Sequence, residues 1–191
     1  LSLVMTILLS SCAVEKKKLT ENVGKYVPPN IDDTNFKNYV ISNKNFDETW
    51  ISVIDFVNDS FFKIENLEKD AGLLTLSFGS KEPENFIDCG DFEYTLFFTG
   101  EEFKGSYIDY AQSGLLAVLE AKMNINIQKL DNESTKVSVN TNYTFSTQHA
   151  LGYYDPNLNQ TYSFVSGGYQ TINVLYPISG SIPTRTCKST N

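Results

Sequence analysis

Histidine and cysteine are scarce in this chain, and their scarcity argues against several kinds of site. The 191 residues include one histidine, His149, and three cysteines, and no Cys-x-x-Cys pair occurs. Protein zinc sites usually combine several histidine and cysteine ligands at short spacings. The sequence also lacks a Gly-x-Ser-x-Gly segment, the turn that exposes a nucleophilic serine. It therefore predicts no metal site and no bound cofactor.

Positive charge and long apolar runs are also in short supply. Lysine and arginine number 15 against 23 acidic residues, which gives a formal net charge of −8 and an isoelectric point near 4.6. Nucleic acids are bound by clusters of lysine and arginine, and the only basic run is Lys16–Lys18. A membrane-spanning helix needs roughly 20 apolar residues, and no segment reaches that length. The composition predicts no nucleic-acid partner.

The most informative segment is the apolar run Leu1–Leu9. It is too short to cross a bilayer but has the length of a signal-peptide core, about 7–15 residues. Small residues and a cysteine follow, and the sequence Leu9-Ser10-Ser11-Cys12 resembles the lipobox of bacterial lipoproteins. The resemblance implies that residues 1–11 are a signal peptide with an incomplete N-terminus, cleaved before Cys12.

In lipoproteins with this motif, the cysteine is acylated on its sulfur and on its amine. Several acyl chains on Cys12 would anchor the protein to the membrane stably, because one chain alone binds only marginally. The residue after the cysteine is Ala13. In this family an aspartate at that position tends to retain the protein at the inner membrane, so Ala13 favours the outer membrane. The resemblance thus implies a lipid-anchored outer-membrane protein with its domain in the periplasm, and an envelope protein as a possible partner.

The other two cysteines, Cys89 and Cys187, form a candidate disulfide if Cys12 carries lipid. Disulfides persist in exported proteins, where the surroundings are oxidising. Such a bond would close a loop of roughly 100 residues and stabilise the fold by about 4–5 kcal/mol through loss of chain entropy in the unfolded state. Two unrelated buried thiols remain the alternative.

Residues 12–43 are expected to be a lipidated, disordered tether, because Glu15–Asn30 is polar and includes two adjacent prolines. A lipoprotein needs a spacer of this kind to hold its domain off the membrane. An edge strand over Phe36–Ile41 is an alternative for part of it. Residues 44–191 are expected to form a single α+β domain.

The best helix covers Asn45–Asn58. Asn45 is a good N-cap, and Glu48 follows three residues later in a capping-box pattern. Trp50 belongs to the apolar stripe of this helix and is interpreted as a core anchor. The members of the stripe recur at helical spacing: Phe46, Trp50, Val53, Ile54 and Val57.

Alternating residues predict several antiparallel strands after this helix. The clearest hairpin joins Leu115–Leu130 to the strand around Val137–Phe145, and Gly72 is expected to adopt positive φ in an earlier turn. Irregular structure is expected over 101–114, 149–168 and 177–191. The other predicted strands are Phe61–Leu67, Leu73–Phe78, Phe92–Phe98, Thr161–Val165 and Tyr169–Tyr176.

One block of the sequence resembles a known architecture. A helix with an early tryptophan, Trp50, leads into Phe61–Ile64 and then into the turn Lys69–Gly72 and another strand. This order resembles the helix-grip domains of outer-membrane lipoproteins such as BamC. It implies a curved antiparallel sheet of five to six strands packed on one main helix. The long C-terminal helix of those domains has no counterpart after Tyr176.

Aromatic residues supply the remaining functional signal. Tyrosine is enriched where proteins bind other molecules, although packing within the sheet is the simpler reading. The sequence therefore predicts a non-enzymatic accessory, scaffold or binding protein. The alternatives are an enzyme or inhibitor that uses the acidic loop Asp88–Glu93, and a carrier of an apolar ligand. The binding candidates are Tyr143, Tyr153, Tyr154, Tyr162 and Tyr169.

Overall fold

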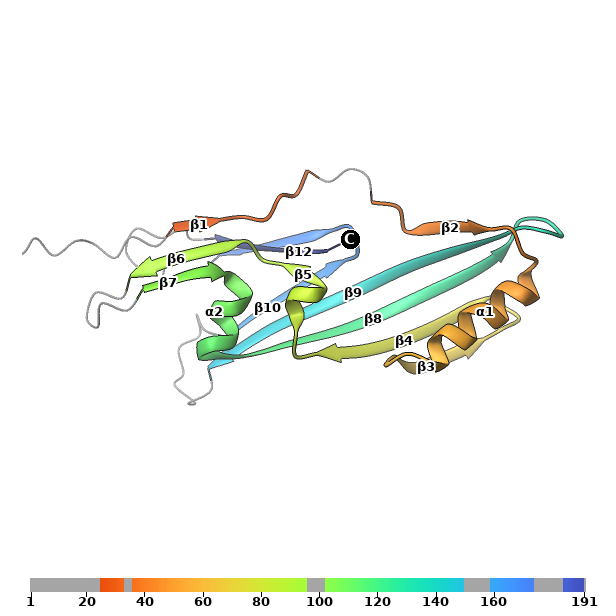
Figure 1. The fold of residues 1–191 in the computed structure, drawn as a ribbon, viewed down its shortest axis with the longest axis horizontal. Coiled ribbons are helices and arrows are strands. Elements are labelled where there is room, and N and C mark those ends of the chain that lie inside the picture. Colours follow the sequence, from red (N-terminus) through yellow and green to blue (C-terminus); the bar gives the residue numbers. More distant parts are fainter. Residues whose placement is uncertain (1–24, 33–35, 96–101, 150–158, 174–183, 191) are drawn as a thin grey trace, which may run out of the picture.

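The computed structural model describes residues 25–32, 36–95, 102–149, 159–173 and 184–190. Within these ranges the protein is mostly antiparallel sheet, and two α-helices lie toward opposite ends of an elongated molecule (Figure 1). The expected curved antiparallel sheet is confirmed, with six strands. The described residues contain two helices, α1 (Phe46–Asn58) and α2 (Tyr107–Gly114), rather than the one main helix that was expected.

A long hairpin forms the backbone of the molecule. Strands β8 (Leu115–Lys129) and β9 (Thr135–His149) each contain 15 residues and pair along their whole length. At about 3.3 Å per residue they run roughly 50 Å. The turn between them is held by Asp131, whose Oδ1 accepts hydrogen bonds from the backbone N–H groups of Glu133 and Ser134 at 2.8 and 2.7 Å. The hairpin predicted from alternation is therefore confirmed and extends further than expected.

Four more strands complete the six-stranded sheet around this hairpin. β4 (Leu73–Ser80) pairs with β8, and β3 (Lys63–Glu68) pairs with β4 at one edge. On the other side, β9 pairs with β10 (Gln160–Val165) over one part of its length and with β2 (Tyr39–Ser42) over another. The sheet order is β10-β9-β8-β4-β3, with β2 beside β9.

Helix α1 covers one end of this sheet. The side chain of Asn45 accepts a hydrogen bond from the backbone N–H of Glu48 at 2.9 Å, so the predicted N-cap is confirmed. Trp50 is buried, as predicted, and belongs to the first of two core clusters. The buried members of this cluster are Trp50, Val57, Leu74, Leu76, Ile125 and Ile127.

A second core lies at the other end, where two small three-stranded sheets meet the long hairpin. It includes the fully buried rings of Phe145 and Tyr162, while Phe62 and Met123 border both cores. One small sheet is β1 (Lys25–Val27), β6 (Asp91–Thr95) and β7 (Glu102–Ser106). The other is β11 (Tyr169–Asn173), β12 (Thr184–Ser189) and β5 (Ile87–Asp88), and a short 3-10 helix, η1 (Pro83–Asn85), precedes β5.

Three expectations about irregular structure need correction. The expected tether contains β1, whose Tyr26 is buried, and β2, so described parts of residues 12–43 belong to the fold. Residues 102–114 form β7 and α2, and residues 184–189 form β12. These segments are short and show little apolar periodicity, so their structure depends on partners distant in the sequence.

Gly72 tests the turn between β3 and β4. It has φ +65°, as predicted, and a Cβ atom there would lie 2.1 Å from the carbonyl oxygen of Ile127. We expect Gly72→Ala to lower the free energy of unfolding by about 2 kcal/mol, because the backbone at residue 72 and the backbone at Ile127 must both shift to make room for the new Cβ atom. Urea unfolding measures the change. Gly79→Ala is the matched control: its nearest contact would be 3.5 Å away, so stability should stay equal or rise.

Candidate functional site

The face of the six-stranded sheet that points away from α1 carries many polar side chains, with the exposed apolar side chains of Leu116 and Val118 at one end. Along β4, Leu74 and Leu76 are buried in the core beneath α1. Successive residues of a strand point to opposite faces, so Ser77 and Gly79 lie on the face away from α1. The same alternation along β8 and β9 puts polar side chains on this face. They include Glu120, Lys122, Asn124, Asn140, Asn142 and Thr144.

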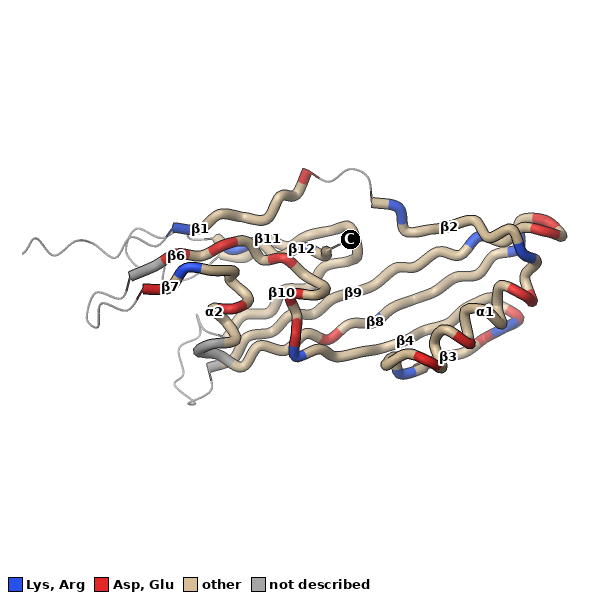
Figure 2. The backbone as a smooth tube through the Cα atoms, viewed as in Figure 1, with Lys and Arg blue, Asp and Glu red and all other residues tan. Residues whose placement is uncertain are grey.

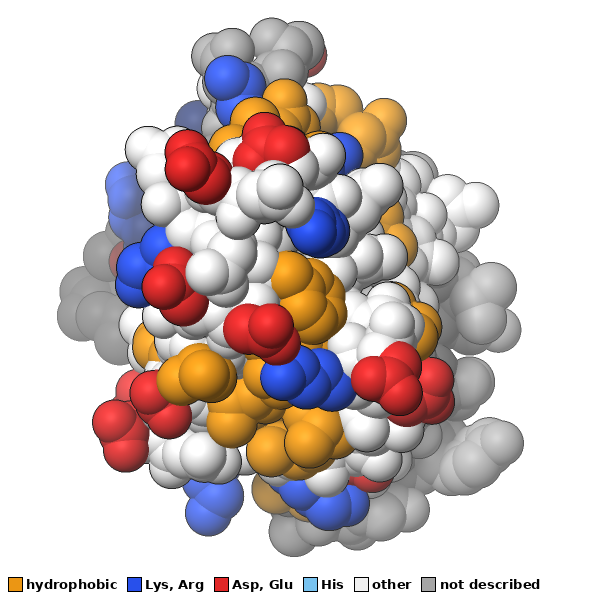
Figure 3. Space-filling view, turned by 90° about the vertical axis from the view of Figure 1, so that its right-hand side faces the viewer, with side chains coloured by type: hydrophobic (Ala, Val, Ile, Leu, Met, Phe, Trp, Pro, Cys, Tyr) orange, Lys and Arg blue, Asp and Glu red, His pale blue; other side chains and the backbone are white. Residues whose placement is uncertain are grey.

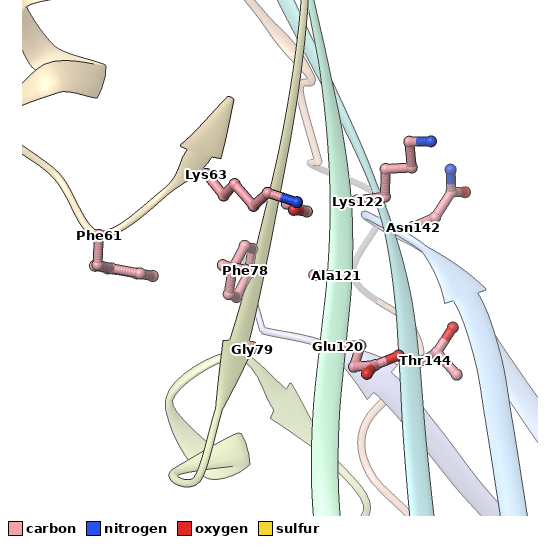
Figure 4. A pocket seen from close by; sticks show the side chains of 10 residues that line it. Phe61, Lys63, Phe78, Gly79, Glu120, Ala121, Lys122, Asn142 and Thr144 are labelled. Carbon is pink, nitrogen blue, oxygen red and sulfur yellow. The ribbon is translucent and has the colours of Figure 1, made fainter. Parts of the chain in front are cut away.

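A hollow of about 460 Å³ lies on this face (Figure 4). Strand register explains it, because two rows of residues run side by side across the sheet. The first row is Lys63, Ser77, Lys122 and Asn142, and the second is Gly79, Glu120 and Thr144. Gly79 has no side chain, so it forms a low point in the second row, where a Cβ atom would lie 3.5 Å from the carbonyl oxygen of Leu119.

The charge of Lys63, which lines the hollow, is balanced by the neighbouring Glu65. Lys63 Nζ lies 2.8 Å from Glu65 Oε1, and Ser77 Oγ donates to the same carboxylate oxygen at 2.7 Å. Hydrogen bonding to Lys63, then to Ser77, and the positive charges of Lys63 and Lys122 hold the pKa of Glu65 below its usual range. Glu65 therefore stays ionised at neutral pH and keeps Lys63 and Ser77 in place beside Gly79.

The hollow offers ammonium, carboxylate, amide and hydroxyl groups beside the apolar side chains of Phe61, Phe78 and Ala121. Thr144 and Glu120 also line a second hollow of about 340 Å³, which continues along β8 and β9 past Val118 and Ser146. Neither lining contains a histidine or cysteine. The chemistry of this face suits hydrogen bonding to a polar ligand or partner surface.

The predicted tyrosine set does not form one surface. Tyr143 and Tyr162 are buried in the second core, which corrects their assignment as binding residues. The two strands place these side chains on the core face, where Tyr143 stacks on Phe164 with ring centres 5.8 Å apart. Tyr169 is 53% exposed and lies on β11. The other two candidates, Tyr153 and Tyr154, lie outside the described residues.

Two carboxylates of the acidic loop Asp88–Glu93 make contacts within the fold. Asp88 Oδ1 accepts a hydrogen bond from the backbone N–H of Gly90 at 2.8 Å, and Glu93 forms an ion pair with Lys104 at 3.7 Å. Lys25 stands opposite Glu93 on the neighbouring strand. Asp88 thus stabilises a turn, and Glu93 pairs with a lysine of the small sheet.

The disulfide predicted between Cys89 and Cys187 is confirmed. Cys89 and Cys187 are joined by a disulfide, and both are buried in the second core. The bond connects the turn between β5 and β6 to β12 near the end of the chain. Cys12 lies outside the described residues.

Beside the disulfide, aromatic rings enclose the buried guanidinium of Arg185. Its Cζ atom lies 4.7 Å from the ring centre of Tyr26, 4.8 Å from that of Phe92 and 5.9 Å from that of Tyr107. Its Nη1 donates to the carbonyl oxygen of Thr184 at 2.9 Å. Such cation–π contacts strengthen when water is excluded. This cluster therefore holds β1, β6, α2 and β12 together rather than forming an open site.

Tyr26 supplies the polar link in the same cluster. Its hydroxyl lies 3.0 Å from the carbonyl oxygens of Cys89 and Thr186 and accepts from the backbone N–H of Thr186 at 2.9 Å. We expect Tyr26→Phe to lower the free energy of unfolding by about 1–3 kcal/mol, because buried backbone groups lose their partner. Thermal unfolding measures the loss. Tyr39→Phe, at a 43% exposed ring, should change stability by less than about 0.5 kcal/mol.

Sequence reasoning missed the residues of the hollow. The alternation of Glu120 and Lys122 with the buried residues Leu119 and Ala121 did contain the signal for a shared face. Their meeting with Ser77 and Asn142, however, follows from the pairing of strands far apart in the sequence.

Comparison with known proteins adds no relative: the chain matches no family model, no curated protein and no solved structure. Across the described ranges, no helix has the length and hydrophobicity that a membrane span requires. Nor does that part of the chain gather three or more histidine, cysteine, aspartate or glutamate side chains into a potential metal site. The function is therefore inferred from the residues and their geometry.

Proposed function

We propose that this chain is an exported binding protein of the bacterial envelope, held in the outer membrane by acyl chains on Cys12, with a non-enzymatic domain in the periplasm. The observation that carries the proposal is the buried disulfide between Cys89 and Cys187. Bonds of this kind persist in exported proteins and are rare in the reducing cytosol. The disulfide therefore supports the proposal that the domain folds outside the cytosol.

With two cysteines bonded to each other, Cys12 is the one left for modification. It follows the apolar run Leu1–Leu9 and two serines, as an acylated cysteine does in the lipoproteins that this segment resembles. Lipid on Cys12 would anchor the protein independently of any apolar surface on its domain. The residues before β1 would then connect the anchor to the fold.

The sheet supports the binding role. One side is filled by the two cores, and α1 packs on it. The other side presents the hollow around Gly79 and the row of hydrogen-bonding groups beside it. A sheet face that carries such hydrogen-bonding groups suits an accessory or scaffold protein that recognises a partner.

Acylation is tested by labelling the full-length protein with palmitate in a bacterial host and separating the membranes. We expect label on the wild-type protein in the outer-membrane fraction, its loss in Cys12→Ala, and accumulation of unprocessed precursor with globomycin. The matched control is Cys89→Ala/Cys187→Ala, which should keep the label because neither residue is the acylation site. Equal labelling of wild type and Cys12→Ala would overturn the anchor.

A further inference from the structure

The outer strands of the six-stranded sheet are protected to different degrees. β3 carries Lys63, Glu65 and Glu68, and its pairing with β4 is interrupted by a bulge between Ile64 and Asn66. Charges and bulges on an edge strand discourage pairing with another chain. β10 is backed by β11, where Gln170 accepts a hydrogen bond from the backbone N–H of Ser163. Both strands are therefore shielded against a further strand.

β2 lacks these protections. The segment Asn38–Asn43 contains no charged residue and no proline, and the described structure pairs β2 with β9 alone. Val40 and Ile41 are 63% and 58% exposed. In Figure 3, apolar side chains lie along the upper margin of this end of the molecule, where Figure 1 places β2. An exposed apolar edge without charge is a template for another strand.

Backbone geometry leaves hydrogen-bonding groups available on this edge. The backbone N–H of Val139 donates to the carbonyl oxygen of Asn38 at 2.7 Å. Bonded residues alternate along an antiparallel pair, so Val40 bonds inward to β9, whereas Tyr39 and Ile41 direct their N–H and C=O groups outward. A partner strand would pair with these outward groups.

Charges around β2 indicate the chemistry of that strand. Lys37 and Lys44 stand on either side of the uncharged segment, and Lys136 of β9 lies with its Nζ 4.6 Å from the ring centre of Tyr39. Figure 2 shows basic positions at both ends of β2 and on the neighbouring part of β9. Acidic residues at the ends of a bound segment would complement this arrangement.

The same charges argue against a second copy of this chain. Two copies could pair through the outward groups of Tyr39 and Ile41 as antiparallel β2 strands. At each end of that pair, Lys37 of one copy would lie within one residue of Lys44 in the other. Like charges placed together disfavour a complex. The net charge of −8 adds repulsion between copies.

We propose that β2 binds an extended segment of a partner protein as an added strand, and that this segment carries aspartate or glutamate on both sides of an apolar stretch. Main-chain hydrogen bonds to Tyr39 and Ile41 would give affinity, and the flanking lysines would select the partner. This inference rests on the binding role proposed above and does not depend on the lipid anchor.

The test uses the full chain with Cys12→Ser, so that acylation does not enter the result. The probe is a synthetic peptide in which valine alternates with threonine and glutamates stand at both ends, and the comparison peptide has lysines at its ends. We expect the acidic peptide to bind about tenfold more tightly at low salt, with the difference shrinking as salt rises. Amide NMR shifts at residues 39–42 locate the binding.

Two variants separate the strand from its charges. Ile41→Pro removes an outward N–H while the bonds to β9 remain, so the fold should persist by circular dichroism and peptide affinity should fall at least about tenfold. Lys37→Glu/Lys44→Glu should reverse the preference between the two peptides. Lys81→Glu/Lys104→Glu makes the same change in net charge away from β2 and should leave the preference intact.

Three outcomes would overturn the proposal. One is equal affinity for the acidic and basic peptides, or no affinity for either. Another is acidic-peptide binding that survives Ile41→Pro, which would move the site elsewhere on the protein. The third is self-association of the chain that Ile41→Pro abolishes, which would assign this edge to a second copy. Each of these can occur whether or not Cys12 is acylated.

Discussion

Replacing Cys89 and Cys187 by alanine is expected to lower the free energy of unfolding by about 3–5 kcal/mol. The bond joins residues 98 positions apart, so its loss frees a long loop in the unfolded chain. It also ties β12 to the turn beside Tyr26, whose hydroxyl forms hydrogen bonds with buried backbone groups of Cys89 and Thr186. Urea unfolding of the oxidised wild type and the double variant gives the difference.

Reduction provides the matched comparison for this prediction. The wild-type protein, unfolded and refolded with a thiol reductant, should have the stability of the double variant, because both lack the same covalent link. Agreement between them would separate the bond from any effect of the alanine side chains. A loss below about 1 kcal/mol would contradict the assignment of this disulfide as a main support of the second core.

Local signals in the sequence were sufficient for much of the fold. The cap at Asn45 and the apolar stripe through Trp50 define α1, and positive φ at Gly72 defines the turn that follows β3. Alternation along 115–149 defines the long hairpin, whose two strands follow each other directly in the chain. Each of these elements is specified by residues within its own segment.

The missed elements depend on distant contacts. β1 exists because Tyr26 reaches the backbone of Cys89 and Thr186, which lie 63 and 160 residues away. β12 has a polar sequence, Thr184–Ser189, yet four of its six residues are buried between β11 and β5. Periodicity within a short segment does not reveal such a position, because burial is imposed by neighbours from elsewhere in the chain.

The candidate site shows both the use and the limit of alternation. Val139, Tyr143 and Phe145 share one face of β9, so the pattern that predicted the hairpin already placed Tyr143 in the core rather than at a binding surface. The opposite parity predicts an outward face for Asn142 and Thr144. Only strand register brings Asn142 beside Lys122 and Thr144 beside Glu120.

Raising the pH above about 10 is expected to unfold the protein steeply. Burial raises the pKa of Tyr26, Tyr107, Tyr143 and Tyr162, most strongly for Tyr162. These hydroxyls keep their protons in the folded state, while the unfolded chain releases them near pH 10. Their contribution is therefore complete below about pH 10 and is lost as pH rises toward the folded-state pKa values.

The size of the alkaline effect follows from proton linkage. For each tyrosine still protonated in the fold, the unfolding equilibrium constant rises by up to about tenfold per pH unit above 10. Urea midpoints measured between about pH 8 and pH 11, with tyrosinate absorbance followed in parallel, test this. Tyr162→Phe, which loses a hydrogen bond to Gln160 Oε1, should lower stability at neutral pH but reduce the alkaline slope by about one proton. Complete tyrosine ionisation near pH 10 in the folded protein would contradict the burial of these rings.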